Sequence, residues 1–431
     1  MSVLAWQVIA AVVKGGVAIF GLLTVFAYMT LIERRVVARM QSRLGPNRAG
    51  PFGLFQPLAD AIKMAFKEQI IPTRARLLAY LVAPSVSIFV ALVAFAVVPL
   101  GDATTWGTGP IARAWAPFVG SVNVGLLYIL AISSLAVYGI VLGGWSSGNR
   151  YSLLGALRSA AQMVSYEVSI ALSLAGAVMF AGTLDLLGIV HAQVTQHIWF
   201  ILAQPLGFLL YGIAAVAEVN RAPFDLPEAE QELVAGYLTE FSGLRWSLFQ
   251  MAEYVNMVTV SSLAVTLYFG GWTLGALDGV PGVPFIWYVI KVAACLFVFI
   301  WLRATLPRIR YDKLMRFGWQ TLLPLSVLNL VATSIIVTLA PPNYQWLISL
   351  GFSLVVLGIF ALIYMRRSRR AGARQHVMEV GMAMPGSVRL VHGYEVAVAT
   401  VGTAASGAGG ASSSGGAPPD LPAGAEGTAR R

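Results

Sequence analysis

Residues that hold redox centres and metals are scarce in this chain. It has a single cysteine, Cys295, among 431 residues, so it can form no intrachain disulfide and hold no iron–sulfur cluster, which takes about four ligands. The four histidines are scattered at positions 191, 197, 376 and 392, without the spacing of a metal site. The sequence also lacks a phosphate-binding loop and a dinucleotide-binding glycine motif. If the protein takes part in redox chemistry, the electrons must arrive from another subunit.

Charge is scarce as well, and long apolar runs take its place. Only 11% of the residues are charged and 58% are hydrophobic, with a mean hydropathy of +0.75, whereas about a quarter of an ordinary soluble chain is charged. Apolar runs of about 20 residues can cross a bilayer as helices. The sequence therefore predicts an all-α polytopic membrane protein with about nine transmembrane helices, at 3–31, 77–100, 120–142, 160–181, 198–217, 249–271, 285–304, 321–340 and 345–365.

The basic residues predict how these helices are oriented. Lys and Arg crowd the loop 32–76, and by alternation they recur on the same side at 150–158, 221–245 and 308–316 and after 365. Because basic loops stay in the cytoplasm, we expect the N-terminus outside and the C-terminus in the cytoplasm. The net charge of +10 reflects this bias, so no nucleic-acid partner is needed to explain it.

The composition changes after residue 365. A basic stretch, RRSRR, follows the last apolar run, and a Gly/Ala/Ser/Pro-rich run occupies 403–429. Such a run cannot bury a hydrophobic core and is expected to be disordered, while weak alternation at 388–399 favours a short hairpin. We therefore divide the chain into a transmembrane helical domain, 1–365, and a largely disordered cytoplasmic tail, 366–431.

The first polar loop contains a helical pattern. Leu58, Ile62 and Phe66 form an apolar stripe, while Asp60 and Lys63 share another face. The pattern predicts an amphipathic helix in the membrane interface. Two interpretations remain open: a surface anchor with topology-setting arginines nearby, or a cavity wall whose polar face meets an amphipathic ligand.

The densest group of carboxylates lies between two apolar stretches, at 217–241, where the sequence reads AEVNRAPFDLPEAEQELVAGYLTEF. Asp225 and Glu228 resemble a helix cap with its capping-box partner, which would explain two of the acids. Glu228 and Glu232 then share one helix face, where like charges oppose each other. Crowded carboxylates raise one another's pKa and can exchange protons near neutral pH. Of the two interpretations, structural capping and proton handling, we favour proton handling.

Ionisable residues also occur inside the predicted spans. Glu167 lies about two turns into the fourth span, and Glu253 lies near the start of the sixth. A buried carboxylate is costly unless it is paired or protonated, so we interpret both as a polar path that continues from the acidic segment. Snorkelling or a helix contact explains Lys14 and remains open for Lys291. The basic patch at 303–319 reflects topology alone or supplies counter-charge to the carboxylates.

Together these motifs resemble a known family. The H subunit of bacterial NADH-quinone oxidoreductase (respiratory complex I) is similar over about residues 15–340, and the similarity rests on ERRVVARMQSRLGPNRAGPFGLFQPLADAIKMAFKE, SYEVSIALSL, AEVNRAPFDLPEAEQELVAGYLTEFSG, AEYVNM and RATLPRIRYDKLM. The resemblance implies a membrane subunit at the junction with the peripheral arm, where quinone enters a narrow chamber from the bilayer. It implies that this chain binds no cofactor, that quinone is the substrate, and that NADH, FMN and the iron–sulfur clusters are held by partner subunits. Peripheral-arm subunits and small membrane-arm subunits are the implied partners, in a bacterial plasma membrane.

The family's charged positions match this sequence in two groups, with Asp312 as a further match. In our hypothesis, quinone reduction shifts the coupled protonation of the acidic segment, and the change passes through Glu218, Glu253 and Glu167 toward antiporter-like subunits. The implied quinone-chamber residues are Glu33, Arg34, Arg43, Asp60, Lys63, Arg303 and Arg308. The implied proton-coupling residues are Glu167, Glu218, Arg221, Asp225, Glu228, Glu230, Glu232, Glu240 and Glu253.

Two alternative functions remain open from the sequence. The first is the homologous subunit of a membrane-bound hydrogenase or a cofactor-420 dehydrogenase, which shares part of the core motifs. The GPNR and NRAPFDLPEAEQELVAG runs favour the NADH-quinone family over it. The second is a stand-alone secondary transporter, but such folds tend to show internal repeats, and we find none. A transporter would be stable alone, whereas this subunit is expected to co-purify with many partners.

Overall fold

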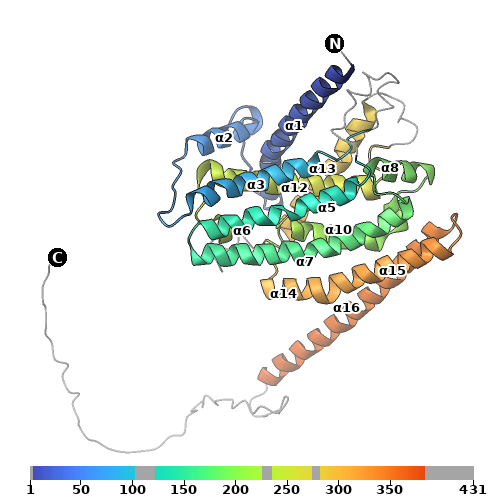
Figure 1. The fold of residues 1–431 in the computed structure, drawn as a ribbon. Helices are drawn as coiled ribbons and strands as arrows, with labels where there is room; N and C mark the ends of the chain where they lie inside the picture. The colour runs from blue at the N-terminus through green and yellow to red at the C-terminus, as the bar shows by residue number, and fades with distance from the viewer. Residues whose placement is uncertain (1–2, 102–121, 226–234, 274–281, 384–431) are drawn as a thin grey trace, which may run out of the picture. The chain divides into compact units, whose positions relative to one another are not determined.

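The computed structural model describes residues 3–101, 122–225, 235–273 and 282–383 (Figure 1). Every regular element in these ranges is a helix, which confirms the all-α prediction. The chain divides into two units, Met1–Ala361 and Leu362–Arg431, and the candidate site lies in the first. The hairpin predicted at 388–399 and the Gly/Ala/Ser/Pro run fall outside the described residues.

Seven helices in the described ranges are long and apolar enough to cross a membrane. Two of them are composite, because α5 runs into α6 and α14 continues through a π-helical turn, η4, into α15. They comprise Val8–Met40 of α1 (Val3–Met40), α3 (Leu77–Phe95), α5 (Gly125–Ser134) with α6 (Ala136–Ser146), α7 (Arg150–Ala181), α13 (Val283–Thr305), α14 (Tyr311–Phe317) with η4 (Gly318–Leu322) and α15 (Leu323–Leu339), and Gln345–Ile363 of α16 (Gln345–Ala383).

The sequence predicted about nine spans, and the described residues contain seven helices that meet the criteria of length and hydropathy, so the predicted number is not confirmed. The remaining two predicted spans are helical but differ from the other seven. The run at 198–217 is divided into α9 (Phe200–Ala203) and the 14-residue α10 (Pro205–Glu218), because Pro205 has no N–H to continue the first helix and instead begins the second. The run at 249–271 becomes α12 (Gly243–Tyr268), which has 26 residues but includes the polar Glu253 and Asn256.

Several helix ends differ from the predicted ones. Helix α1 continues past the predicted end at 31 to Met40, because its charged residues are good helix formers and no Gly or Pro intervenes before Gly45. Helix α7 begins at Arg150 rather than near 160, and the Asn149 side chain caps it by accepting from the Tyr151 N–H at 3.0 Å. The short helix α8 (Leu186–Thr195) was not predicted, and Asp185 caps it.

The amphipathic helix predicted in the first polar loop is present as α2 (Gln56–Phe66), preceded by the 3₁₀ turn η1 (Pro51–Gly53). None of its residues is buried, and Leu58, Ile62 and Phe66 are exposed. The turn that leads into α2 requires glycine at position 53, where φ is +73° and a Cβ would come within 2.6 Å of the Pro46 carbonyl oxygen.

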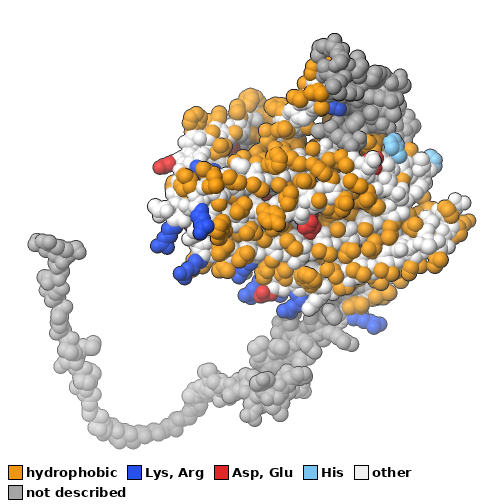
Figure 2. All heavy atoms as spheres, in the orientation of Figure 1, with side chains coloured by type: hydrophobic (Ala, Val, Ile, Leu, Met, Phe, Trp, Pro, Cys, Tyr) orange, Lys and Arg blue, Asp and Glu red, His pale blue; other side chains and the backbone are white. Residues whose placement is uncertain are grey.

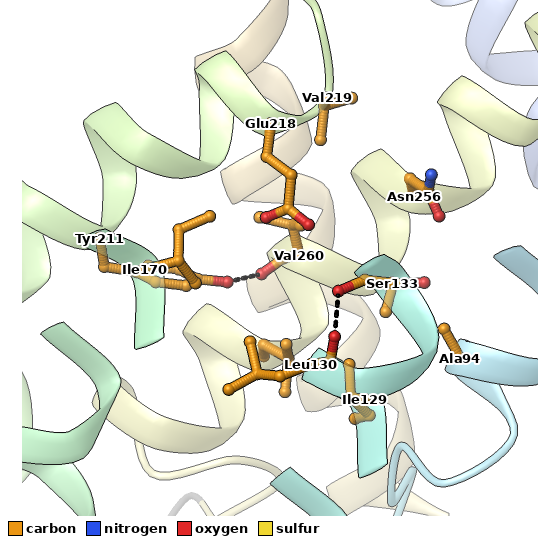
Figure 3. A pocket seen from close by; sticks show the side chains of 12 residues that line it. Ala94, Ile129, Leu130, Ser133, Ile170, Tyr211, Glu218, Val219, Asn256 and Val260 are labelled. Atoms are coloured by element: carbon orange, nitrogen blue, oxygen red, sulfur yellow. Dashed lines mark hydrogen bonds between the residues drawn. The ribbon is translucent and has the colours of Figure 1, made fainter. Parts of the chain in front are cut away.

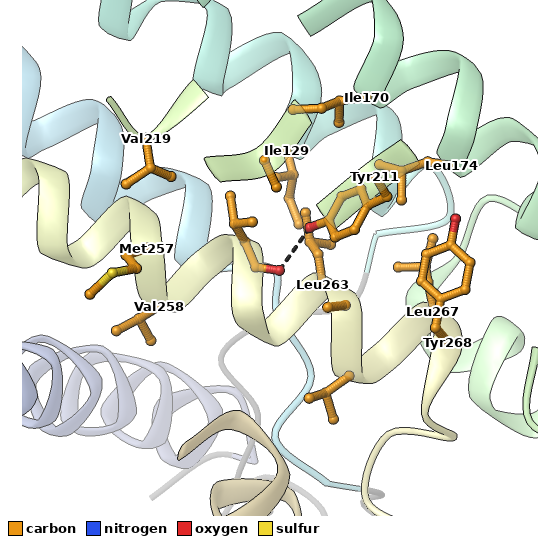
Figure 4. Packing of buried hydrophobic residues seen from close by; sticks show 14 of the residues in the cluster. Ile129, Ile170, Leu174, Tyr211, Val219, Met257, Val258, Leu263, Leu267 and Tyr268 are labelled. Atoms are coloured by element: carbon orange, nitrogen blue, oxygen red, sulfur yellow. Dashed lines mark hydrogen bonds between the residues drawn. The ribbon is translucent and has the colours of Figure 1, made fainter. Parts of the chain in front are cut away.

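The core is built around α12, which packs against α1, α3 and α13 and also contacts α7 and α10. Tyrosine hydroxyls form hydrogen bonds between these helices. Tyr211 of α10 donates to the Val260 carbonyl of α12 at 2.7 Å (Figure 4), and Tyr268 of α12 donates to the Ser173 carbonyl of α7 at 3.1 Å. Where α7 meets the turn η3 (Gly236–Leu238), a Cβ on Gly155 would lie 2.5 Å from the Gly236 Cα. Such close backbone approach and interhelical hydrogen bonds are what hold helices together in a membrane.

Candidate functional site

A cavity of about 430 Å³ opens between α1, α2, α12 and α13. Small-molecule sites commonly measure about 300–1,000 Å³, so the cavity can take an organic ligand. Its walls are largely apolar, and charged groups gather at its floor and at its rim. The lining residues are Phe26, Ala27, Thr30, Glu33, Arg34, Val37, Pro57, Asp60, Ala61, Lys63, Met64, Trp246, Ser247, Gln250, Tyr254 and Arg303.

The floor of this cavity is organised by Glu33 on α1, which is only 6% exposed. Its Oε2 accepts a hydrogen bond of 2.6 Å from the Tyr254 hydroxyl. Its Oε1 is paired with Arg303 and lies 3.6 Å from Nη1 of Arg221. The four residues come from α1, α12, α13 and the turn after α10. Because removal of one member of a buried ion pair costs roughly 3–5 kcal/mol, this group fixes the relative position of the four segments.

Arg221 is the most deeply buried cation at the floor, at 6% exposure, and its guanidinium lies 4.0 Å from the centre of the Tyr254 ring. Burial lowers its pKa, but the neighbouring Tyr254, Glu33 and Glu253 raise that pKa above its usual value, so it stays charged. Its Nε and Nη2 groups have no hydrogen-bond partner among the described residues. Two arginines against one carboxylate make the floor electropositive, which suits a carbonyl or anionic oxygen.

The rim of the cavity is held by Asp60 on α2. This carboxylate accepts from Arg34 of α1 at 2.9 Å, from Gln56 at 3.2 Å and from Lys63 at 3.4 Å. Arg34 and Lys63 are largely exposed, and an exposed ion pair contributes about 1 kcal/mol or less. The rim therefore joins α2 to α1 by weak links, in contrast to the buried floor.

Behind the floor, α12 presents a second set of polar groups on a neighbouring face of the helix. Glu253 accepts a 3.0 Å hydrogen bond from the Tyr237 hydroxyl, and with Glu218 it lines a small internal cavity. Glu218 also lines a second small cavity beside Ser133 (Figure 3). Glu167 on α7 is partly exposed and close enough to Glu218 for their charges to interact. The structure thus brings Glu253 and Glu218 together, with Glu167 nearby.

Other predicted site residues lie elsewhere. Arg43 and Arg308 are exposed in the segments that follow α1 and α13, and they do not line the cavity. Glu240 lies between η3 and α12, where its Oε1 accepts a 2.8 Å hydrogen bond from Asn149, the residue that caps α7, and its backbone carbonyl accepts from Tyr80. These two contacts are typical of a structural role, because they join the segment before α12 to α7 and α3.

The acidic segment is only partly described. Asp225 is buried at 8% exposure, in a turn that Gln162 holds by donating to the carbonyls of Ala217 and Phe224 at 2.7 and 2.9 Å. The predicted coupling residues Glu228, Glu230 and Glu232 lie outside the described residues.

Some site residues were missed from the sequence. Trp246, Gln250 and Tyr254 are spaced i, i+4 and i+8 along α12, and all three face the cavity. Their spacing is the signal of a shared helix face, but aromatic and amide side chains in an apolar helix are equally typical of a packed core. Tyr237 and Asn256 lie within the quoted motifs but were assigned no role, because their roles depend on neighbours that are distant in sequence.

Within the part of the chain that the structure describes, no three His, Cys, Asp or Glu side chains gather in a way that could hold a metal ion. The single thiol, Cys295, is partly buried in α13. The polar side chains that line the cavity are hydrogen-bond donors, fixed charges and carboxylates.

Comparison with known proteins agrees with the motifs. The family described as NADH dehydrogenase matches residues 13–334. The H subunit of the Deinococcus deserti NADH-quinone oxidoreductase is 49% identical over 82% of this chain and 89% of its own. Subunit 8 of the Thermus thermophilus enzyme is 48% identical over 83% and 95%, and the H subunit of the Thermomicrobium roseum enzyme is 51% identical over 77% and 97%. This chain belongs to the H-subunit family of NADH-quinone oxidoreductases.

Proposed function

We propose that this subunit forms the quinone access chamber of a proton-translocating NADH-quinone oxidoreductase, at the junction with the peripheral arm. The observation that supports the proposal is the cavity whose apolar walls end on Glu33, Arg303 and Tyr254, with Arg221 held directly behind Glu33 and Tyr254. A quinone is an apolar ring and chain with two carbonyl oxygens. The walls suit the ring and chain, and the guanidinium and hydroxyl donors at the floor suit the oxygens.

The same floor supports coupling to proton movement. Reduction of a quinone takes up two electrons and two protons and yields a quinol. Negative charge that develops in the chamber attracts Arg221, whose charge also interacts with Glu253 on the other side of α12. A change in the chamber therefore alters the charge balance at Glu253, and from there at Glu218 and Glu167. Asp225, Glu228, Glu230 and Glu232 extend this set in sequence toward the cytoplasmic surface.

The redox centres belong to other subunits in this proposal. This chain carries quinone as substrate, and NADH, FMN and the iron–sulfur clusters are held by peripheral-arm partners, with small membrane-arm subunits packed alongside. Figure 2 shows a broad hydrophobic band with most of the visible Lys and Arg side chains gathered at one end of the bundle. With the positive-inside rule, this distribution supports a bacterial plasma-membrane protein with its N-terminus outside and its C-terminus in the cytoplasm.

The chamber is tested by Arg34→Ala in the purified complex. Loss of the Arg34–Asp60 link at the rim should slow quinone reduction several-fold, while NADH oxidation by a soluble acceptor that bypasses the chamber stays normal. Arg39→Ala is the matched control, because Arg39 is exposed on the same helix and does not line the cavity. Equal loss of both activities in Arg34→Ala would indicate misassembly and count against a role in the chamber.

Coupling through the acidic segment is tested by a double substitution, Glu228→Gln with Glu232→Gln. The complex should assemble but reduce quinone and pump protons more slowly, because the crowded carboxylates that exchange protons are gone. Reconstituted vesicles report pumping, and a quinone assay reports turnover. Normal pumping and turnover in the double variant would reject the role of this segment.

A further inference from the structure

Two small internal cavities flank Glu218. In the first cavity, the centre of a water molecule can occupy a volume of about 20 Å³. This cavity is lined by Ser87, Asn220, Tyr237 and Glu253 among others. In the second cavity this volume is about 30 Å³, and the lining includes Ser133, Tyr211 and Thr259 among others. A cavity needs about 10–15 Å³ by this measure, and two to four polar partners, to hold a water molecule. Each cavity therefore has room and polar lining for about one or two waters.

The two cavities share one stretch of wall. Glu218, Val219 and Asn256 line both of them, and Glu253 lies one turn before Asn256 on α12. Figure 3 shows the Glu218 carboxylate pointing from the end of α10 toward α12 and α5, with Asn256 of α12 on the far side of the cavity. Besides Glu218 itself, Asn256 is therefore the polar side chain that lines both the cavity beside Glu253 and the cavity beside Ser133.

The buried amides of this bundle show what a purely structural role looks like. Gln162 donates to the carbonyls of Ala217 and Phe224, and Gln193 bridges Thr266 to the N–H groups of Phe200 and Gly270. Each of these amides ties two segments of backbone together. Asn256 instead faces the two cavities, where an amide can donate to one water and accept from another.

We propose that Asn256 is a positioning residue that holds water between the carboxyl groups of Glu253 and Glu218. This inference rests on the proposed coupling function. A protonated carboxyl on one side gives its proton to a water, that water passes a proton onward, and the carboxylate on the other side becomes protonated. The amide releases no proton itself and only orients the water. The number of protons is conserved, and the chain of waters carries no net charge before or after the transfer.

Asn256→Leu tests the inference, because leucine keeps the approximate volume and removes the hydrogen-bonding groups. The rate of quinone reduction coupled to pumping should fall by up to about tenfold, since the amide positions the water through hydrogen bonds that contribute about 0.5–1.5 kcal/mol each. The KM for quinone and NADH oxidation by a soluble acceptor should not change. Asn256→Ser, which keeps a hydroxyl in the cavity, should recover part of the rate. Asn329→Leu is the matched control, since Asn329 is a buried asparagine of α15 that lines neither cavity.

The outcomes separate this inference from the proposed function. A wild-type rate and wild-type pumping in Asn256→Leu, with Arg34→Ala behaving as expected, would overturn the inference alone. A raised KM for quinone would overturn it too, because it would place Asn256 in the chamber. A normal quinone rate in Arg34→Ala would count against the chamber itself. A density map of the intact complex should show ordered water against the Asn256 amide in the wild type and none there in Asn256→Leu; empty cavities in the wild type would reject the proposal.

Discussion

Two adjacent residues on α12, Glu253 and Tyr254, face different cavities of the protein. Successive residues on a helix point about 100° apart, so Tyr254 reaches the chamber floor while Glu253 reaches the internal cavity behind it. Each has its own hydrogen-bonded partner, Glu33 for Tyr254 and Tyr237 for Glu253. The Arg221 guanidinium lies over the Tyr254 ring, and its charge interacts with that of Glu253. In the proposed function, the quinone cavity and the carboxylates that respond to it are therefore separated by the backbone of a single helix, α12.

Tyr254→Phe tests the floor at this scale. The variant keeps the ring under Arg221 and removes only the 2.6 Å hydrogen bond to Glu33. A hydrogen bond to a charged group contributes about 1.5–3 kcal/mol, so quinone reduction should fall by roughly tenfold to a hundredfold. The soluble-acceptor activity of the complex should not change. Tyr128→Phe is the control, because Tyr128 lies on α5 away from the chamber; a similar loss in both variants would show that the hydroxyl has no specific role.

At the scale of elements, the apolar runs predicted the helices but not their ends or interruptions. The end of α1 was placed near 31, because Glu33 and Arg34 read as a loop, whereas these residues continue the helix and lie in the chamber wall. The break at Gln204–Pro205 was passed over because apolar residues lie on both sides. Hydropathy reports burial over about 20 residues and cannot resolve a change in backbone within one turn.

The turn after the C-terminal end of α12 is held by one lysine of α13. The Lys291 ammonium donates to the carbonyls of Phe269, Gly271 and Thr273 at 2.7, 2.9 and 3.1 Å and lies 4.9 Å from the Trp199 ring centre. These carbonyls lie in the turn that follows α12, where buried backbone groups need partners from outside the helix. The structure thus resolves the question left by the sequence, since Lys291 contacts the end of a neighbouring helix.

Lys291→Met should destabilise the protein because three carbonyls in a buried site lose their donor. The loss should be on the order of 3 kcal/mol, given that unsatisfied buried polar groups cost about 1–3 kcal/mol each and are not additive. Thermal dissociation of the purified complex, followed on native gels, measures it. Lys313→Met is the control, because Lys313 is exposed on α14. Equal thermal stability of the Lys291 variant and the wild type would show that the three hydrogen bonds from Lys291 do not stabilise this turn.

At the scale of the whole molecule, the sequence identified charged residues more reliably than it grouped them. Glu33, Asp60 and Arg303 are far apart in the chain, and the family resemblance alone predicted that they belong to one quinone chamber. The structure places all three in the lining of one cavity between α1, α2, α12 and α13, and the binding of quinone there stays a prediction. Arg43 and Arg308 were grouped with them but are exposed and do not line the cavity. Which loop cations turn inward depends on where the backbone emerges from the bundle, and charge patterning carries no information about that.

The tail beyond residue 400 should be dispensable for catalysis. Its Gly/Ala/Ser-rich composition offers little apolar surface to offset ordering, which costs roughly 1–2 kcal/mol per residue of backbone. The family model matches up to residue 334, and the residues that line the cavity end at Arg303, so truncation after Thr400 removes nothing that the proposed function uses. Quinone reductase activity and assembly, measured on the purified complex, should stay near wild type. A truncated complex that lost its peripheral arm during purification would show that the tail is a docking element, and the view of it as a passive extension would be wrong.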